Sequence, residues 1–122
     1  MEALDGTFGI VYAGAFFHLF DRPEQLLLAK RVTALLAAKP GSMVLGRQVG
    51  NVNPGRYDHA TNEGGYMFRH NEQSWRELWD EAGAETGVKW EVQAELKMTG
   101  RFTRPGYNSE GARQMYFCVR RV

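Results

Sequence analysis

The amino-acid sequence predicts an α/β fold in which a βαβ unit is followed by a second helix and a C-terminal antiparallel hairpin. Residues Phe8–Phe17 are apolar or small and carry no charge, which is typical of a strand buried on both faces of a parallel sheet. A helical segment separates this run from a second short apolar strand at Ser42–Gly46. Because parallel strands need a crossover, these segments form a βαβ unit, whose crossover we expect to be right-handed.

The crossover helix has clear start and stop signals. Asp21 is the expected N-cap, with Glu24 three residues later as in a capping box. Pro23 lies in the first turn, where its missing N–H leaves no hydrogen bond unmade. The segment Lys39–Gly41 ends the helix. We expect its buried face to be the apolar stripe formed by Leu28, Val32, Leu35 and Leu36.

The segment Gly46–Gly65 is rich in glycine and asparagine and contains Pro54. This composition predicts a long loop without regular structure. Loops of this length in a compact domain usually carry function or move.

The second half of the chain predicts a helix and a hairpin. The helix begins near Asn71, which is its candidate N-cap. The segment Lys89–Met98 alternates apolar and polar residues as a half-exposed strand does. Met115–Val119 is the final buried strand, and the polar segment Gly100–Arg113 forms a long hairpin tip. The expected buried face of the helix consists of Trp75, Leu78, Trp79 and Ala82.

The composition is that of an ordinary globular protein. The net charge of +1 offers no basic surplus for nucleic acid, and the single cysteine, Cys118, cannot form an internal disulfide. No apolar stretch reaches the roughly 18 residues of a membrane span, and Met1–Asp5 lacks the basic start of a signal peptide. We therefore expect a single cytoplasmic domain over residues 1–122, with no nucleic-acid partner and no membrane association.

The sequence contains none of the common cofactor or catalytic motifs that we searched for. It has no glycine-rich dinucleotide or P-loop fingerprint, no HExxH, no CxxC and no GxSxG. The histidines His18, His59 and His70 lie far apart along the chain, and no carboxylate pair has the spacing of metal ligands. We therefore expect neither a metal nor a bound cofactor.

His18 is the strongest candidate for a catalytic residue. It stands at the carboxyl end of the first predicted strand, and sites in open parallel sheets gather at the carboxyl ends of strands. A neutral imidazole there is suited to general-base catalysis. The alternative is a histidine that caps the loop through a backbone hydrogen bond. The flanking aromatic residues Phe17 and Phe20 are then candidates for substrate binding.

Other substrate-binding candidates follow the same logic of position. Arg47 and Gln48 come directly after the second predicted strand, and a solvated loop is the alternative for them. His70 precedes the tryptophan helix and either faces the same cleft or lies on the surface. Trp75 is a candidate lining residue, although its spacing to Trp79 is that of a packed helix face, which we favour as the explanation.

Several segments together resemble one protein family, the fungal class I S-adenosylmethionine-dependent methyltransferases of secondary metabolism. The most specific are FFHLF and KPGSMVLGRQVG. The segments that carry the resemblance are Phe8–Phe20, Asp21–Gln25, Lys39–Gly46, Arg47–Gly50 and Phe68–Asn71, with Ser74, Trp75, Leu78 and Trp79.

The resemblance implies a truncated Rossmann-like half-domain that corresponds to the C-terminal half of the family's domain. In that family the first three of seven strands bind the cofactor, and this chain is expected to begin at the fourth. His18 then matches the position of the histidine base of related O-methyltransferases. The segment Phe68–Trp79 matches one that lines the substrate pocket. The family's glycine-rich loop and ribose-binding acid have no counterpart in the sequence, so we expect the chain alone not to bind S-adenosylmethionine.

These expectations leave three functions open. The first is a cofactor-independent enzyme of terpenoid or polyketide biosynthesis that catalyses cyclisation, isomerisation or a pericyclic step on a small molecule. The second is a remnant, or one subunit, of a split methyltransferase. The third is a non-catalytic binding protein.

The absence of the first three strands has a consequence for assembly. Without them the apolar strand Phe8–Phe17 is a bare sheet edge, and bare apolar edges associate unless they are covered. We expect a homodimer formed through this edge. The alternative is that the segment Gly46–Gly65 folds over it.

Overall fold

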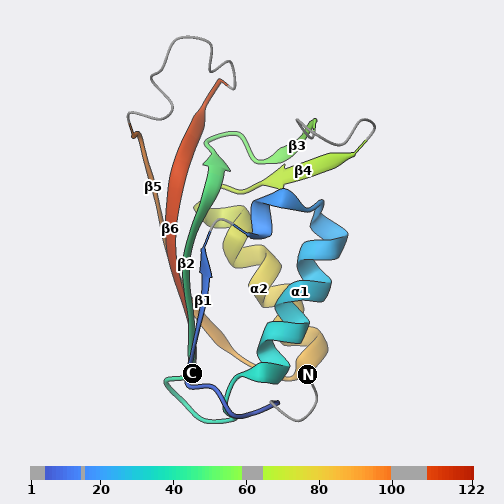
Figure 1. Cartoon of the computed structure of the whole chain (residues 1–122), viewed down its shortest axis with the longest axis vertical. Helices are drawn as coiled ribbons and strands as arrows, with labels where there is room; N and C mark the ends of the chain where they lie inside the picture. Colours follow the sequence, from blue (N-terminus) through green and yellow to red (C-terminus); the bar gives the residue numbers. More distant parts are fainter. Residues whose placement is uncertain (1–4, 15, 59–64, 100–109) are drawn as a thin grey trace.

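The computed structural model describes residues 5–14, 16–58, 65–99 and 110–122. In these ranges no helix is long and apolar enough to cross a membrane. The elements in chain order are β1 (Ile10–Gly14), the 3₁₀ turn η2 (Phe17–Leu19), α1 (Arg22–Leu35), β2 (Met43–Asn51), β3 (Gly55–Asp58), β4 (Tyr66–Arg69), α2 (Glu72–Thr86), β5 (Trp90–Lys97) and β6 (Ala112–Arg121) (Figure 1).

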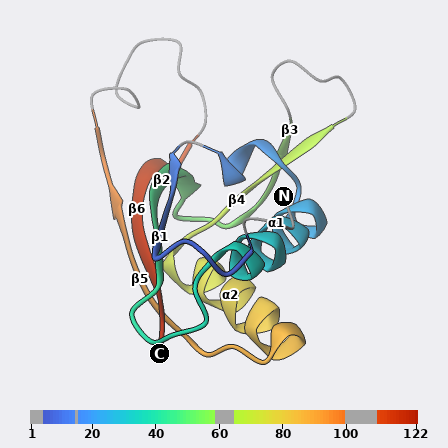
Figure 2. The same ribbon diagram turned by 60° about the horizontal axis from the view of Figure 1, so that its bottom comes forward.

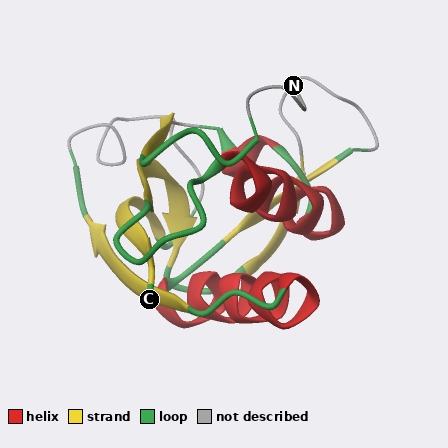
Figure 3. Cartoon of the chain, turned by 90° about the horizontal axis from the view of Figure 1, so that it is seen from below, coloured by secondary structure: helices red, strands yellow, loops and turns green. Residues whose placement is uncertain are grey.

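The main sheet has the strand order β1-β2-β6-β5. β1 pairs with β2 in parallel, which confirms the predicted βαβ unit. β5 and β6 pair in antiparallel fashion, which confirms the predicted hairpin, although its tip at residues 100–109 lies outside the described ranges. β3 and β4 form a separate two-stranded sheet. Figures 1, 2 and 3 show both helices on the same side of the main sheet.

The core lies between the helices and the main sheet. The predicted buried face of α2 is confirmed, because Trp75, Leu78, Trp79 and Ala82 are all fully buried. The Trp75 ring meets the ring of Phe117 on β6 with 4.8 Å between ring centroids. Asn71 caps the helix as predicted. Its side-chain oxygen accepts a hydrogen bond from the Ser74 N–H, and the Ser74 hydroxyl oxygen accepts one from the Asn71 N–H.

The N-cap of α1 is also confirmed, because the Asp21 side chain accepts a hydrogen bond from the Arg22 N–H. The hydrogen-bonded Arg56 guanidinium holds the pKa of Asp21 below its usual value. The predicted apolar stripe is only partly right. Leu28 and Val32 are half-buried, and the fully enclosed positions follow a neighbouring line of the helix, which consists of Gln25, Ala29 and Thr33 and continues to Leu36. Polar residues occupy this line because their side chains are hydrogen-bonded.

β1 is shorter and more exposed than predicted. It ends at Gly14, and Phe17 belongs to the η2 turn. The prediction that both faces of β1 are buried is wrong, since Ile10 is 60% and Tyr12 67% exposed. Both helices cover the other face, and β1 lies at the edge of the sheet with β2 on one side. The bare edge expected from the sequence is therefore present among the described strands.

The predicted loop over Gly46–Gly65 is also wrong, because β2 continues to Asn51 and β3 follows at Gly55–Asp58. The glycines of β2 allow close packing. A Cβ atom at Gly46 would overlap the Ala13 carbonyl and the Phe117 ring, and one at Gly50 would overlap the His70 carbonyl oxygen. Glycine in a strand therefore marks close approach of neighbouring chain segments here.

Candidate functional site

A polar cavity of about 320 Å³ lies just beyond the end of β1, beside the second half of β2. η2 contributes one wall, the second half of β2 another, and β6 and the segment after β5 the rest. The lining residues are His18, Arg47, Gln48, Val49, Thr99, Gln114 and Tyr116. The cavity therefore lies at the carboxyl end of β1, and sites in α/β sheets usually lie at such strand ends. The prediction that Arg47 and Gln48 follow the second strand is wrong, because β2 continues past them to Asn51.

The cavity brings together His18, Arg47 and Gln48, which the sequence analysis singled out separately. His18 follows β1 on the η2 turn and is 8% exposed. Arg47 and Gln48 are consecutive on β2, and Arg47 lies opposite Tyr116 in the β2–β6 register. The catalytic role of His18 stays a prediction, but its position at a shared cavity meets the geometric requirement for one.

Gln48 has an unusual environment. Its side chain is almost fully buried, and its Nε2 lies 3.3 Å from the Met115 Sδ, a weak acceptor. Its Oε1 is buried and has no hydrogen-bond partner within the described part of the chain. The neighbouring Gln114 donates from its Nε2 to the Gln48 backbone carbonyl at 3.1 Å. A buried carbonyl without a donor costs about 1–3 kcal/mol, so the Gln48 side chain is a destabilising polar group in the cavity wall.

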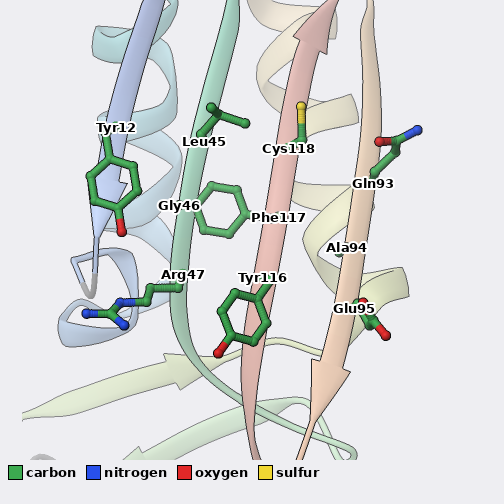
Figure 4. A pocket seen from close by; sticks show the side chains of 10 residues that line it. All are labelled: Tyr12, Leu45, Gly46, Arg47, Gln93, Ala94, Glu95, Tyr116, Phe117 and Cys118. Carbon is green, nitrogen blue, oxygen red and sulfur yellow. The ribbon is translucent and has the colours of Figure 1, made fainter.

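A wider and shallower hollow of about 780 Å³ runs over the face of the sheet that the helices leave open. Figure 4 shows this face with the helices behind the sheet. Tyr12, Arg47 and Tyr116 project toward the viewer from β1, β2 and β6, and Leu45 and Cys118 lie further along the same face. Arg47 and Tyr116 line both hollows, so the polar cavity and the open face are continuous.

The aromatic candidates are placed differently from His18. Phe17 is 1% exposed and packs edge-on against Trp75, with 5.2 Å between ring centroids. Phe20 is half-buried and packs edge-on against Phe16 at 5.4 Å. None of the three predicted aromatic residues lines either hollow. Phe17 and Trp75 instead belong to the hydrophobic core. The contact between their rings attaches the η2 turn to α2.

His70 also lies away from both hollows, in a buried hydrogen-bond network. Its Nε2 is 2.7 Å from the Gln25 Oε1, and its Nδ1 is 2.9 Å from the Ser74 Oγ. Burial, with a smaller contribution from the charge of Arg22, lowers the pKa of His70 to about 3. His70 is therefore a neutral interior side chain at neutral pH.

Three polar residues of the cavity were not predicted from the sequence. They are Thr99, Gln114 and Tyr116. Gln114 and Tyr116 lie on β6, which begins at Ala112 and so extends beyond the predicted strand Met115–Val119. No alternation of polar and apolar residues marks this start, because Arg113 and Gln114 are consecutive polar residues before the apolar run. The register that sets Tyr116 opposite Arg47 has no signal in the sequence, because it depends on the pairing of β2 with β6.

The side chains that line the cavity can exchange a proton with a bound molecule. The described lining does not fit a nucleoside cofactor. His18 can accept or donate a proton, Arg47 supplies a permanent positive charge, and Tyr116 supplies a hydroxyl. No carboxylate is among the described lining residues, so none is placed to bind a ribose. We therefore derive no chemical step through such a cofactor. The described ranges also contain no group of three or more metal-ligating side chains.

Comparison with known proteins supports the resemblance that the sequence analysis identified. No family model matches the chain. The O-methyltransferase atr3 of Stereocaulon alpinum is 38% identical over 122 residues, which is 100% of this chain and 35% of that protein. The O-methyltransferase phiE of a fungal species (strain ATCC 74256) is 38% identical over 92 residues, 75% of this chain and 30% of phiE. The methyltransferase ausD of Penicillium brasilianum is 39% identical over 93 residues, 76% of this chain and 33% of ausD.

The solved structures support the same fold. A phosphoethanolamine N-methyltransferase of Haemonchus contortus, in complex with phosphomonomethylethanolamine and S-adenosylhomocysteine, superposes with a TM-score of 0.60. The match covers 97% of this chain and 34% of that one, at 12% identity. The chain therefore has a fold found in methyltransferases of the Rossmann-like class. It is similar in sequence to fungal methyltransferases and spans about a third of their length.

Proposed function

We propose that this chain is the substrate-binding part of a methyltransferase-like enzyme that acts on a small molecule in fungal secondary metabolism. The observation that carries the proposal is the polar cavity, in which His18, just after the carboxyl end of β1, meets Arg47 and Gln48 of β2. The similarity to fungal O-methyltransferases supports the substrate class.

In this proposal His18 is the proton acceptor. A neutral imidazole beside a bound hydroxyl takes its proton, so that the oxygen becomes a nucleophile. Gln48 borders the cavity beside Arg47 and contributes to its polar wall. Arg47 stabilises the negative charge that develops on the oxygen. The continuous open face with Tyr12 and Leu45 offers apolar surface for the rest of the molecule.

A further polypeptide segment completes the fold in this proposal. Among the strands of the described ranges, β2 is the one neighbour of β1, and Ile10 and Tyr12 of β1 are exposed. Apolar edge strands pair with other chain segments when these are available. The relatives that cover this chain are about three times its length, so the completing segment corresponds to their remaining part. When it is absent, a second copy of this chain occupies the edge and forms a homodimer.

A second candidate function is a cofactor-independent step such as cyclisation, isomerisation or a pericyclic reaction. The observation that favours it is the composition of the cavity, which holds an imidazole, a guanidinium and a phenol but no carboxylate among its described lining residues. Such a set can shift protons and polarise an oxygen without another reactant.

One experiment separates the two functions. The chain is titrated calorimetrically with S-adenosylmethionine, alone and together with a separately expressed N-terminal two-thirds of the O-methyltransferase atr3. Binding and methyl transfer to a phenolic acceptor only in the mixture support the methyltransferase function. Conversion of pathway intermediates by the chain alone, without the methyl donor, supports the cofactor-independent function. Both proposals are wrong if neither the mixture nor the chain alone converts a substrate and neither binds S-adenosylmethionine or a substrate.

A further inference from the structure

We propose that Gln25 and His70 are a positioning pair that holds the η2 turn, and with it His18, at the edge of the polar cavity. The inference rests on the proposed function, because a role for His18 gives its exact placement a purpose. Its evidence is a continuous set of buried hydrogen bonds that joins α1, η2, β4 and α2 behind the cavity.

Gln25 is the centre of this network. It is fully buried on α1, and its Nε2 lies 2.9 Å from the Phe20 carbonyl oxygen and 2.9 Å from the Phe68 carbonyl oxygen. Carbonyl oxygens only accept hydrogen bonds, so the amide nitrogen must face them. The side-chain oxygen of Gln25 therefore points the other way, toward His70.

This orientation decides the tautomer of His70. The Gln25 Oε1, 2.7 Å from the His70 Nε2, can only accept, so the Nε2 carries the proton. The Nδ1 is then an acceptor and receives the Ser74 hydroxyl proton at 2.9 Å. Ser74 in turn accepts the Asn71 N–H at 3.0 Å. The Ser74 hydroxyl also lies 3.3 Å from the Asn71 carbonyl oxygen, so its proton has two acceptors. The Gln25–His70 pair has one arrangement, in which His70 holds the amide of Gln25 in the orientation that bonds both carbonyls.

The network reaches His18 through Phe20, which follows the η2 turn. The Phe20 N–H donates to the Phe17 carbonyl at 3.1 Å, and the Phe20 carbonyl accepts from both Gln25 and the Phe68 N–H, the latter at 2.9 Å. The end of the turn is therefore bonded to α1 and β4 at one atom. At its start the Phe17 ring is packed on Trp75. His18 lies between these two attachments, on the turn that borders the cavity.

Thr33 provides a matched control in the same helix. It is also buried on α1, and its hydroxyl donates to the Ala29 carbonyl at 2.8 Å within the helix. Thr33→Val removes a buried hydrogen bond without touching η2 or β4. An effect on the turn that Gln25→Leu produces and Thr33→Val does not is therefore specific to the network.

The test uses nuclear magnetic resonance on the full chain with ¹⁵N- and ¹³C-labelled histidine. The His18 ring signals are assigned with His18→Asn. We expect Gln25→Leu and His70→Leu to shift the His18 ring signals and its titration curve. They should also speed hydrogen exchange of the Leu19, Phe20 and Phe68 amides by about 3- to 10-fold relative to the central strands β2 and β6. His70→Gln keeps a side-chain donor toward Gln25. In this variant the His18 ring signals and the amide exchange rates should stay close to those of the wild type.

Two results would overturn the proposal. The first is that Gln25→Leu changes the turn and the central strands equally and leaves the His18 signals in place, as expected for Thr33→Val. The second needs no substitution, since the wild-type His70 must show the tautomer protonated at Nε2; a proton on Nδ1 excludes the network as described. Neither readout requires turnover. The experiment can therefore contradict the positioning role of Gln25 and His70 without deciding whether His18 is catalytic, and a His18 without catalytic function would leave the positioning role intact.

Discussion

Arg47 and Tyr116 lie directly opposite each other in the β2–β6 register and line both the polar cavity and the open face of the sheet. They therefore stand where a polar site meets an apolar surface. A substrate with a hydroxyl at one end and an apolar body would pass this pair, with its polar end toward His18. The arrangement is common in small-molecule sites, which combine apolar walls with a few polar groups.

The first prediction concerns His18. General acid–base catalysis contributes about 10²- to 10⁴-fold in rate, so His18→Ala should lose turnover by that factor while keeping a melting temperature close to wild type. His18→Gln separates two roles, because glutamine forms hydrogen bonds but does not shuttle protons near neutral pH. Turnover by His18→Gln at the wild-type rate would limit His18 to orienting the substrate. A large drop in melting temperature with unchanged turnover per folded molecule would make it a structural loop cap.

The second prediction is a loss of stability in mild acid that depends on His70. Its pKa in the folded chain is about 3, below the ordinary value of 6.5, so folding favours the neutral form. This contribution is complete above about pH 6.5 and is lost as the pH falls toward the folded value, by up to about 1.4 kcal/mol per pH unit. Urea unfolding at pH 7, 5 and 4 measures it. His70→Gln should show a flatter pH dependence over this range, and an equally steep one would contradict the prediction.

The third prediction concerns the packing of Gly46. A Cβ atom there would overlap the Ala13 backbone carbonyl, which cannot move without breaking the β1–β2 ladder. Gly46→Ala should therefore lower the free energy of unfolding by about 2 kcal/mol or more. Gly9→Ala is the control, because nothing lies within 4 Å of a Cβ at that position. Equal urea midpoints for the two variants would show that β1 and β2 are not packed as described.

The fourth prediction concerns self-association through β1. The isolated chain should be a dimer in light scattering at high micromolar concentration, because Ile10 and Tyr12 are exposed at an unpaired edge. Ile10→Lys should shift it toward monomer, since a charged side chain at the edge opposes pairing. Leu27→Lys, at an exposed position on α1, is the matched control and should leave the dimer intact. A monomeric wild-type chain would contradict the prediction.

Much of the fold was predictable because its signals are local. The caps of α1 and α2 at Asp21 and Asn71 follow from residue types at fixed spacing. The buried face with Trp75 and Trp79 follows from helical periodicity, and β5 follows from strict alternation. These patterns are set within a few residues, so no distant contact is needed to recognise them.

Tertiary contacts decided the rest. Gly46 and Gly50 fall in the segment that was predicted as a loop, yet they lie within β2. Because they have no side chains, Ala13, Phe117 and His70 approach them closely from distant parts of the chain. Gln25 is buried because Phe20 and Phe68 supply acceptors for its amide, which no helical pattern reveals.

The site divides in the same way. The sequence by itself marked His18 as a residue that follows the first strand, and it marked Arg47 and Gln48 as candidates although β2 continues past them to Asn51. Only the pairing of β2 with β6 placed Gln114 and Tyr116 beside them, and only the packing of α1 on α2 moved His70 into the interior. The physical reason is that position along a strand is a local property. Which side chains share a cavity depends instead on register and packing between segments far apart in the chain.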